Sequence, residues 1–98
     1  MGKAAQHRFF LLAYFANHLS HNRYGFVVSG RLGKAVRRNK IRRRLREVMR
    51  VYNPLITPTL QNGVDVVLVA RPALVGASYH DIHEALGHVL RQAGLLAA

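Results

Sequence analysis

The sequence predicts an α+β fold, a small two-layer sandwich in which helices pack on a mostly antiparallel sheet. Two observations carry this prediction. Short apolar segments of strand length lie at 9–15, 24–29 and 64–70, and apolar residues recur at helical spacing over 34–51 and 78–93. The order is therefore strand, strand, helix, strand, helix, and the 98 residues suffice for one domain over 1–98.

The strand segments are separated by polar connectors. Residues 9–15 (FFLLAYF) are rich in aromatic residues, and residues 64–70 (VDVVLVA) are almost entirely apolar. The turn-rich connector at 17–22 predicts that 24–29 returns as an antiparallel partner of 9–15. A second polar segment, at 57–63, predicts a turn before the last strand.

Residues 34–51 would form a helix about 27 Å long with a single apolar stripe. This stripe consists of Ile41, Leu45, Val48, Met49 and Tyr52. The face opposite the stripe carries Asn39, Arg43, Arg46 and Arg50. In the last helix, Ser78 and Asp81 are spaced as a capping box, and Gly94 stands where the helix should end.

Positive charge is concentrated in one segment. The chain carries 15 Lys and Arg against 4 Asp and Glu, a formal net charge of +11. Ten of these cations lie within 31–50, where Glu47 is the one acid, and eight of the ten are Arg. Because the Arg guanidinium binds phosphate oxygens in a bidentate manner, the segment predicts a phosphate-binding helix and a polyanionic partner.

Composition argues against several other classes of protein. The chain has no Cys, which excludes disulfides and thiol nucleophiles and favours the reducing cytoplasm. The longest apolar run, 9–16, is too short to span a bilayer. The six His lack metal-motif spacing, and the acids are scattered, so we expect neither a catalytic residue nor a metal site in this chain. These acids are Glu47, Asp65, Asp81 and Glu84.

Residues 29–47 (SGRLGKAVRRNKIRRRLRE) resemble the signature of the bacterial ribonuclease P protein subunit. That family has a Gly-x-Ala-Val-x-Arg-Asn core followed by basic residues at helical spacing. The resemblance continues through 64–72 and through Ser78-Tyr79 into the last helix, so it covers nearly the whole chain. It implies a ribosomal-protein-like fold with the basic helix in a left-handed β-α-β crossover, against the general right-handed preference.

The resemblance also implies a function. A ribonuclease P protein component binds the catalytic RNA and the 5′ leader of precursor tRNA, and assists endonucleolytic removal of the leader to give mature tRNA 5′ ends. Catalysis, and the Mg²⁺ it uses, belong to the RNA subunit of the holoenzyme, and the protein alone needs no cofactor. The family motif carries over onto Arg38, Asn39, Arg42, Arg43 and Arg46. The full set of expected RNA-binding residues is Arg31, Lys34, Arg37, Arg38, Asn39, Lys40, Arg42, Arg43, Arg46 and Arg50.

The chain departs from the family pattern in two ways. Gly30 stands where the family usually has Lys, and Lys40 where it usually has Arg or another residue. We also expect the N-terminal family helix, whose aromatic residues line the leader cleft, to be absent from this sequence, because the chain begins about where that helix ends; either the start is truncated or the protein lacks the helix. Leader contacts are then expected from Phe10 and Tyr14, although aromatic residues on strands more often fill the core; Phe9, Tyr24 and Phe26 are further candidates.

Residues 9–15 are apolar on both faces: Phe10, Leu12 and Tyr14 alternate with Phe9, Leu11, Ala13 and Phe15. Because helices cover only one face of a two-layer fold, we expect the other face to form an exposed aromatic patch. A second copy of the chain, leader bases or the missing helix could cover this patch.

Two rival functions use the same basic helix. A structural ribosomal-type RNA-binding protein would bind RNA without any role in cleavage. A double-stranded DNA-binding protein would place 34–50 in a major groove, but a strand precedes this helix where a helix-turn-helix needs another helix. A membrane-surface helix is disfavoured because the core needs the apolar stripe.

Overall fold

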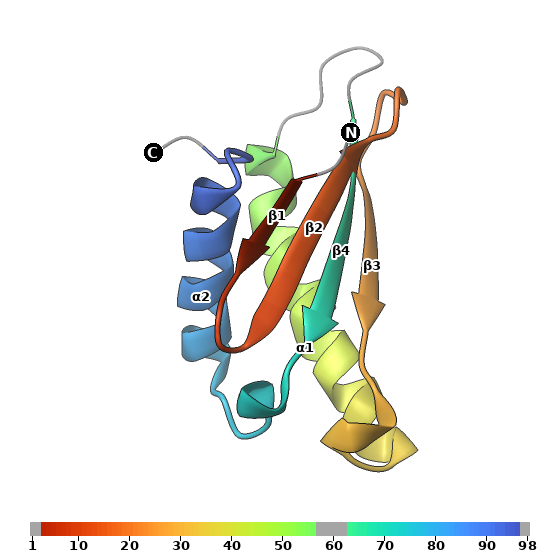
Figure 1. Cartoon of the computed structure of the whole chain (residues 1–98), viewed down its shortest axis with the longest axis vertical. Coiled ribbons are helices and arrows are strands. Elements are labelled where there is room, and N and C mark those ends of the chain that lie inside the picture. Colours follow the sequence, from red (N-terminus) through yellow and green to blue (C-terminus); the bar gives the residue numbers. More distant parts are fainter. Residues whose placement is uncertain (1–2, 57–62, 97–98) are drawn as a thin grey trace.

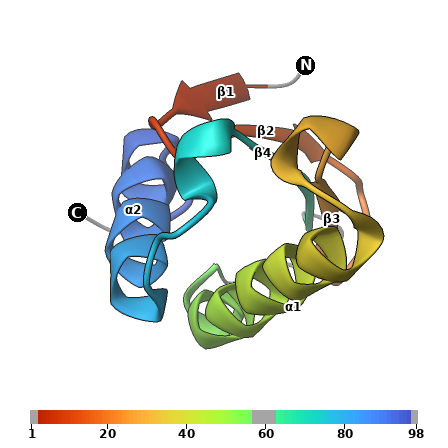
Figure 2. The ribbon, with the colours of Figure 1, turned by 90° about the horizontal axis from the view of Figure 1, so that it is seen from below.

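The computed structural model describes residues 3–56 and 63–96. Within them, four strands form one sheet and two α-helices cover one of its faces, which confirms the α+β two-layer prediction (Figures 1 and 2). In chain order the main elements are β1 (Lys3–Gln6), β2 (Phe10–Ala16), β3 (Arg23–Val27), α1 (Ala35–Tyr52), β4 (Val64–Ala70) and α2 (Tyr79–Gln92). Short 3₁₀ helices are η1 (Gly30–Leu32), η2 (Asn53–Leu55) and η3 (Pro72–Leu74). The turn predicted over 57–63 lies outside the described residues, apart from Gly63.

The strand order is β1-β2-β4-β3, so the predicted hairpin between β2 and β3 is wrong. β4 lies between these two strands and pairs antiparallel with β2 and parallel with β3. In Figure 1 the chain descends along β3, ascends through α1 behind the sheet, and descends again along β4, to the left of β3. This path is a left-handed crossover, as the family resemblance implied.

The connector from β2 to β3 holds the start of β4 and does not form a tight turn. The Asn17 backbone N–H donates to the Gly63 carbonyl at 3.0 Å, and the Gly63 N–H donates to the Leu19 carbonyl at 2.7 Å. A β-carbon on Gly63 would overlap the backbone carbonyl of His21. Only glycine therefore allows the connector to lie this close to the strand.

The core lies between the sheet and the helices. The predicted stripe of α1 is confirmed, because Ile41, Leu45, Val48, Met49 and Tyr52 are all buried. The sheet and α2 contribute the fully buried Phe10, Leu12, Val66, Leu68, Leu86, Val89 and Leu90. The Tyr52 hydroxyl also donates to the His83 carbonyl at 2.8 Å, which ties the end of α1 to α2.

The ends of α2 follow the predicted signals. The Ser78 hydroxyl accepts from the Asp81 N–H, and the Asp81 carboxylate accepts from the Ser78 N–H, so the capping box is present. Gly94 has a φ of 81° just beyond the C-cap.

At the other end of the chain, residues 3–6 form β1, which the sequence did not predict. β1 pairs with β2, and Ala5 joins the core.

The second face of the sheet is open. Strand register places on it Leu11, Ala13, Phe15, Val27, Val67 and Val69. Phe15 and Val27 are 49% and 48% exposed, so the prediction of an exposed apolar face is confirmed. The expected aromatic character is wrong: Phe9 precedes β2 and is buried, which leaves Phe15 as the aromatic residue on this face of the described strands.

Candidate nucleic-acid interface

Helix α1 presents a cationic surface because its opposite side is anchored in the core. Asn39, Arg43, Arg46 and Arg50 are all exposed, as the helical spacing predicted. Arg31, on η1, and Lys34, the N-cap of α1, extend this surface beyond the first turn. The first turn of α1 contains no acidic residue, so its positive helix dipole and the nearby cations reinforce each other.

Among the described residues, no acidic side chain forms a salt bridge with this surface, and Glu47 is the one acid on α1 itself. In the part of the chain that the structure describes, the one salt bridge joins Arg23 to Asp65 at 2.7 Å, away from α1. Hydrogen bonds from Arg23 and Asn17 lower the pKa of Asp65 to about 2. Asp81 is engaged in the capping box of α2. The repulsion among the α1 cations is therefore relieved by solvent or by an external anion.

The flank of α1 that faces β3 borders a groove with aromatic walls. Tyr24 and Phe26, on β3, are partly buried, and the Tyr24 hydroxyl donates to the Asn53 side-chain oxygen. Burial raises the pKa of Tyr24, so its hydroxyl stays protonated at neutral pH. The groove has a volume of about 300 Å³ and is lined by Tyr24, Phe26, Arg46, Met49, Arg50 and Asn53. Guanidinium groups beside aromatic rings suit both the phosphates and the bases of a single strand.

On the same flank, Arg42 is held in place by two acceptors. Its guanidinium donates to the Asn39 side-chain oxygen at 2.9 Å and to the Val28 carbonyl at 3.5 Å. Arg38 and Arg42 are half-buried, unlike the exposed cations of the outer face. Asn39 therefore orients a neighbouring arginine, a role that its place in the family motif did not reveal.

The opposite flank of α1, which faces α2, carries Arg37, Lys40 and Arg44. Arg37 and Lys40 are exposed, and Arg44 is half-buried. One Arg44 nitrogen donates to the Ala77 carbonyl at 3.3 Å. The ten predicted RNA-binding residues therefore lie on the outer face, both flanks and the N-terminal approach of one helix.

The expected leader contact by Phe10 is corrected by the structure. Phe10 is fully buried on the side of the sheet that the helices cover. Tyr14 lies on the same side, packs against the core, and donates its hydroxyl to the Ala93 carbonyl at 2.9 Å. Alternation correctly placed both residues on one face, but it could not show which face the helices cover. Tyr24 and Phe26 are the aromatic residues that line the groove beside the cations.

The acidic and His side chains do not assemble a metal site. Over 3–56 and 63–96, no group of three or more His, Asp or Glu is placed to hold a metal ion. In the same ranges, no helix is long and apolar enough to cross a membrane.

The fold and the site define a small α+β domain with an exposed cationic helix packed on one face of a four-stranded sheet. The family model named Ribonuclease P matches residues 1–94, and the chain belongs to this family. The ribonuclease P protein component of Syntrophomonas wolfei is 35% identical over 96 residues, which cover 98% of this chain and 77% of that protein. That of Roseiflexus sp. is 44% identical over 78 residues, or 79% of this chain and 61% of that protein.

Solved structures of the family share the fold. The Staphylococcus aureus RNase P protein has a TM-score of 0.83 at 32% identity, covering 98% of this chain and 84% of that chain. The Thermotoga maritima protein has a TM-score of 0.79 at 32% identity, covering 93% and 83%. The family implies an RNA partner and a role in processing tRNA 5′ ends.

Proposed function

We propose that this chain is the protein component of a ribonuclease P holoenzyme, which binds the catalytic RNA through α1 and assists endonucleolytic removal of the 5′ leader from precursor tRNA. The observation that carries the proposal is the exposed cationic surface of α1, where Glu47 is the one acidic residue and no cation forms a salt bridge with a described acid. Its physical basis is counterion release: with about six phosphates neutralised, affinity should fall roughly 10³-fold between 50 and 200 mM salt.

We assign the cleavage chemistry and its Mg²⁺ to the RNA subunit. Binding catalytic Mg²⁺ requires converging oxygen ligands, and the carboxylates of this chain do not converge. Asp65 is held by Arg23 and Asn17, and Asp81 caps α2. Glu47 and Glu84 lie on different helices. These four carboxylates therefore do not fit a catalytic metal site. The role of this chain in our proposal is to bind and position RNA, and we place it in the cytoplasm.

We place part of the leader in the groove between β3 and α1. An unpaired leader offers bases that can stack on Tyr24 and Phe26, while Arg46 and Arg50 lie close enough to contact its phosphates. Paired RNA hides its bases, so this groove favours the single-stranded leader over the tRNA body.

Reconstitution tests the proposed function. Protein, catalytic RNA and precursor tRNA are mixed at low Mg²⁺, and 5′ cleavage is followed by gel electrophoresis. We expect efficient cleavage only when all three components are present. A structural ribosomal-type RNA-binding protein would bind RNA but leave cleavage unchanged, and that result would overturn the proposal.

The leader assignment has its own test. Cleavage is compared for precursors with a one-nucleotide leader and with a leader of several nucleotides, using wild type and the double variant Tyr24→Leu/Phe26→Leu. Because stacking on the leader is lost, the double variant should cleave the long-leader substrate roughly tenfold less efficiently than wild type, through weaker substrate binding. Cleavage of the short-leader substrate should be unaffected. Tyr79→Leu, which changes an exposed tyrosine on α2, is the matched control. Equal losses on both substrates would refute the assignment.

Self-association through the open face of the sheet stays a prediction. Sedimentation equilibrium of wild type and Phe15→Asp tests it, because Phe15 is half exposed on that face. A dimer that dissociates in the variant supports self-association, and a wild-type monomer at high concentration refutes it.

A further inference from the structure

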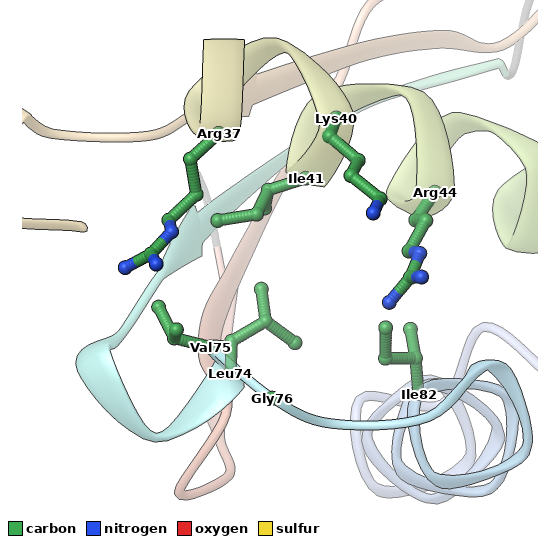
Figure 3. Close-up of a pocket in the computed structure, with 8 residues that line it drawn as sticks. All are labelled: Arg37, Lys40, Ile41, Arg44, Leu74, Val75, Gly76 and Ile82. Carbon is green, nitrogen blue, oxygen red and sulfur yellow. The ribbon is translucent and has the colours of Figure 1, made fainter. Parts of the chain in front are cut away.

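A cavity of about 290 Å³ lies between α1 and the turn that leads from η3 to α2. Figure 3 shows its two walls: the side chains of α1 point across the space toward apolar residues of the turn and of α2. It is lined by Arg37, Lys40, Ile41, Arg44, Leu74, Val75, Gly76 and Ile82. This cavity is on the flank of α1 opposite the groove beside β3.

The cationic wall follows from helical spacing. Arg37, Lys40 and Arg44 recur at intervals of three and four, so they lie along one side of α1 over about 10 Å. The bond from Arg44 to the Ala77 carbonyl anchors one end of this row beside the turn. Figure 3 shows the three charged groups extending into the space between the two walls.

The apolar wall is held by backbone hydrogen bonds. The Val75 N–H donates to the Pro72 carbonyl at 3.1 Å, and the Ala77 N–H donates to the Leu74 carbonyl at 3.0 Å. Gly76 has a φ of 88°, a conformation that residues with side chains rarely adopt. Figure 3 shows Leu74 pointing across the space toward Ile41 and Val75 on the side nearer Arg37; Leu74 is buried, whereas Val75 is 38% exposed.

The two walls require different properties of one ligand. Among the described residues that line the cavity none is acidic, so three cations face it without a counter-charge in its walls. The opposite wall is aliphatic and offers no side-chain hydrogen bond. A ligand that satisfies both walls has an anionic end and a body that packs against aliphatic side chains. A small anion such as sulfate would leave the aliphatic wall exposed to water. A neutral apolar molecule would leave the cations without an anionic partner.

We propose that this cavity binds one unpaired nucleotide of the RNA that lies on α1, with its phosphate on Arg37, Lys40 and Arg44 and its base against Val75, the exposed side chain of the apolar wall. This inference rests on the proposed function, because the strand bound to α1 supplies the nucleotide. The volume is close to the lower end of the range for small-ligand sites and so suits a single nucleotide. The two flanks of α1 then hold two different segments of RNA.

Adenosine 5′-monophosphate is the probe for the isolated site. Amide chemical shifts of the ¹⁵N-labelled full chain are followed during titration with this nucleotide, with inorganic phosphate and with adenosine. We expect saturable shifts at Val75, Gly76 and Ile82 with the nucleotide, and binding at least tenfold weaker with either fragment. Equal effects of phosphate and nucleotide would refute the base contact, and no shift at these amides would refute the site.

Charge in the cavity tests the contact within the RNA complex. Val75→Glu places a carboxylate on the wall assigned to the base, where it faces the cations that hold the phosphate. Val51→Glu adds the same charge to an exposed position of α1 that lines none of the cavities described here. We expect Val75→Glu to weaken binding of the catalytic RNA at least tenfold more than Val51→Glu does. Circular dichroism checks that both variants fold. Equal binding by the two folded variants would overturn the proposal.

Ultraviolet cross-linking of the complex then identifies the source of the nucleotide. We expect an RNA adduct on a peptide containing residues 72–82, and its absence, with adducts elsewhere on α1, would contradict the inference. The nucleotide titration needs no catalytic RNA, so it separates the two proposals. If reconstituted cleavage fails but the cavity binds the nucleotide, the proposed function is refuted and the cavity site is not. If cleavage succeeds but the nucleotide does not bind, the cavity site is refuted and the proposed function is not.

Discussion

Replacing Arg43 and Arg46 together by alanine removes two charges from the exposed side of α1. Both side chains are exposed, and neither forms a salt bridge with a described acid. If each of the two arginines contacts one phosphate, the plot of the logarithm of the RNA association constant against the logarithm of the salt concentration should become shallower. The expected change of its slope is about 1.4 to 1.8. At about 0.1 M salt this corresponds to roughly 25- to 60-fold weaker RNA binding. Thermal stability should stay the same or rise slightly, because like charges at neighbouring positions repel.

The assay is fluorescence anisotropy of labelled catalytic RNA over a series of salt concentrations, with thermal unfolding measured in parallel. Arg8→Ala/Arg91→Ala is the matched control, since it removes the same charge from exposed positions outside α1. An equal change of slope in the control would show that net charge alone sets affinity. A large loss of stability in the α1 variant would show that this face is structural, and either result would refute the reasoning.

Three further predictions concern the fold. The depressed pKa of Asp65, about 2 against the usual 3.8, makes its pairing with Arg23 stabilising above about pH 4 and lost as the pH falls toward 2. Asp65→Asn should therefore be less stable than wild type at pH 7 and equal to it near pH 2 in urea unfolding, and a constant difference would contradict this. Leu45→Ala, at a fully buried position, should lower the free energy of unfolding by about 2 to 5 kcal/mol; a loss below 1 kcal/mol would show that α1 is not anchored there. Gly63→Ala should lower the melting temperature because its methyl group meets the His21 carbonyl, whereas an unchanged temperature would show that the connector can move.

Local patterns predicted the helices and the central strand well. The apolar stripe from Ile41 to Tyr52 and the capping box of Ser78 and Asp81 are properties of residues three to four positions apart. The bounds predicted for β4, residues 64–70, are those of the structure. The basic side chains of α1 followed from the same spacing, since the side of a helix opposite a buried stripe faces solvent.

Patterns that depend on distant partners were predicted poorly. Residues 3–6 carry little strand signal and form β1 only because β2 offers a free edge. The hairpin between β2 and β3 was expected from a short connector, yet β4 occupies the position between them. Phe10 is expected at the leader as an aromatic residue that would replace those of the absent family helix, and its burial under the helices excludes that role.

The sequence by itself determined that one helix carries a dense row of cations above an apolar stripe, because charge and helical periodicity are local properties. The sequence also contains the family motif at residues 29–47, and membership of this family implies an RNA partner. Only the tertiary structure decided which face of the sheet is covered, where β4 inserts, and that each flank of α1 faces its own cavity. These features arise from contacts between segments far apart in the chain, so no local spacing encodes them.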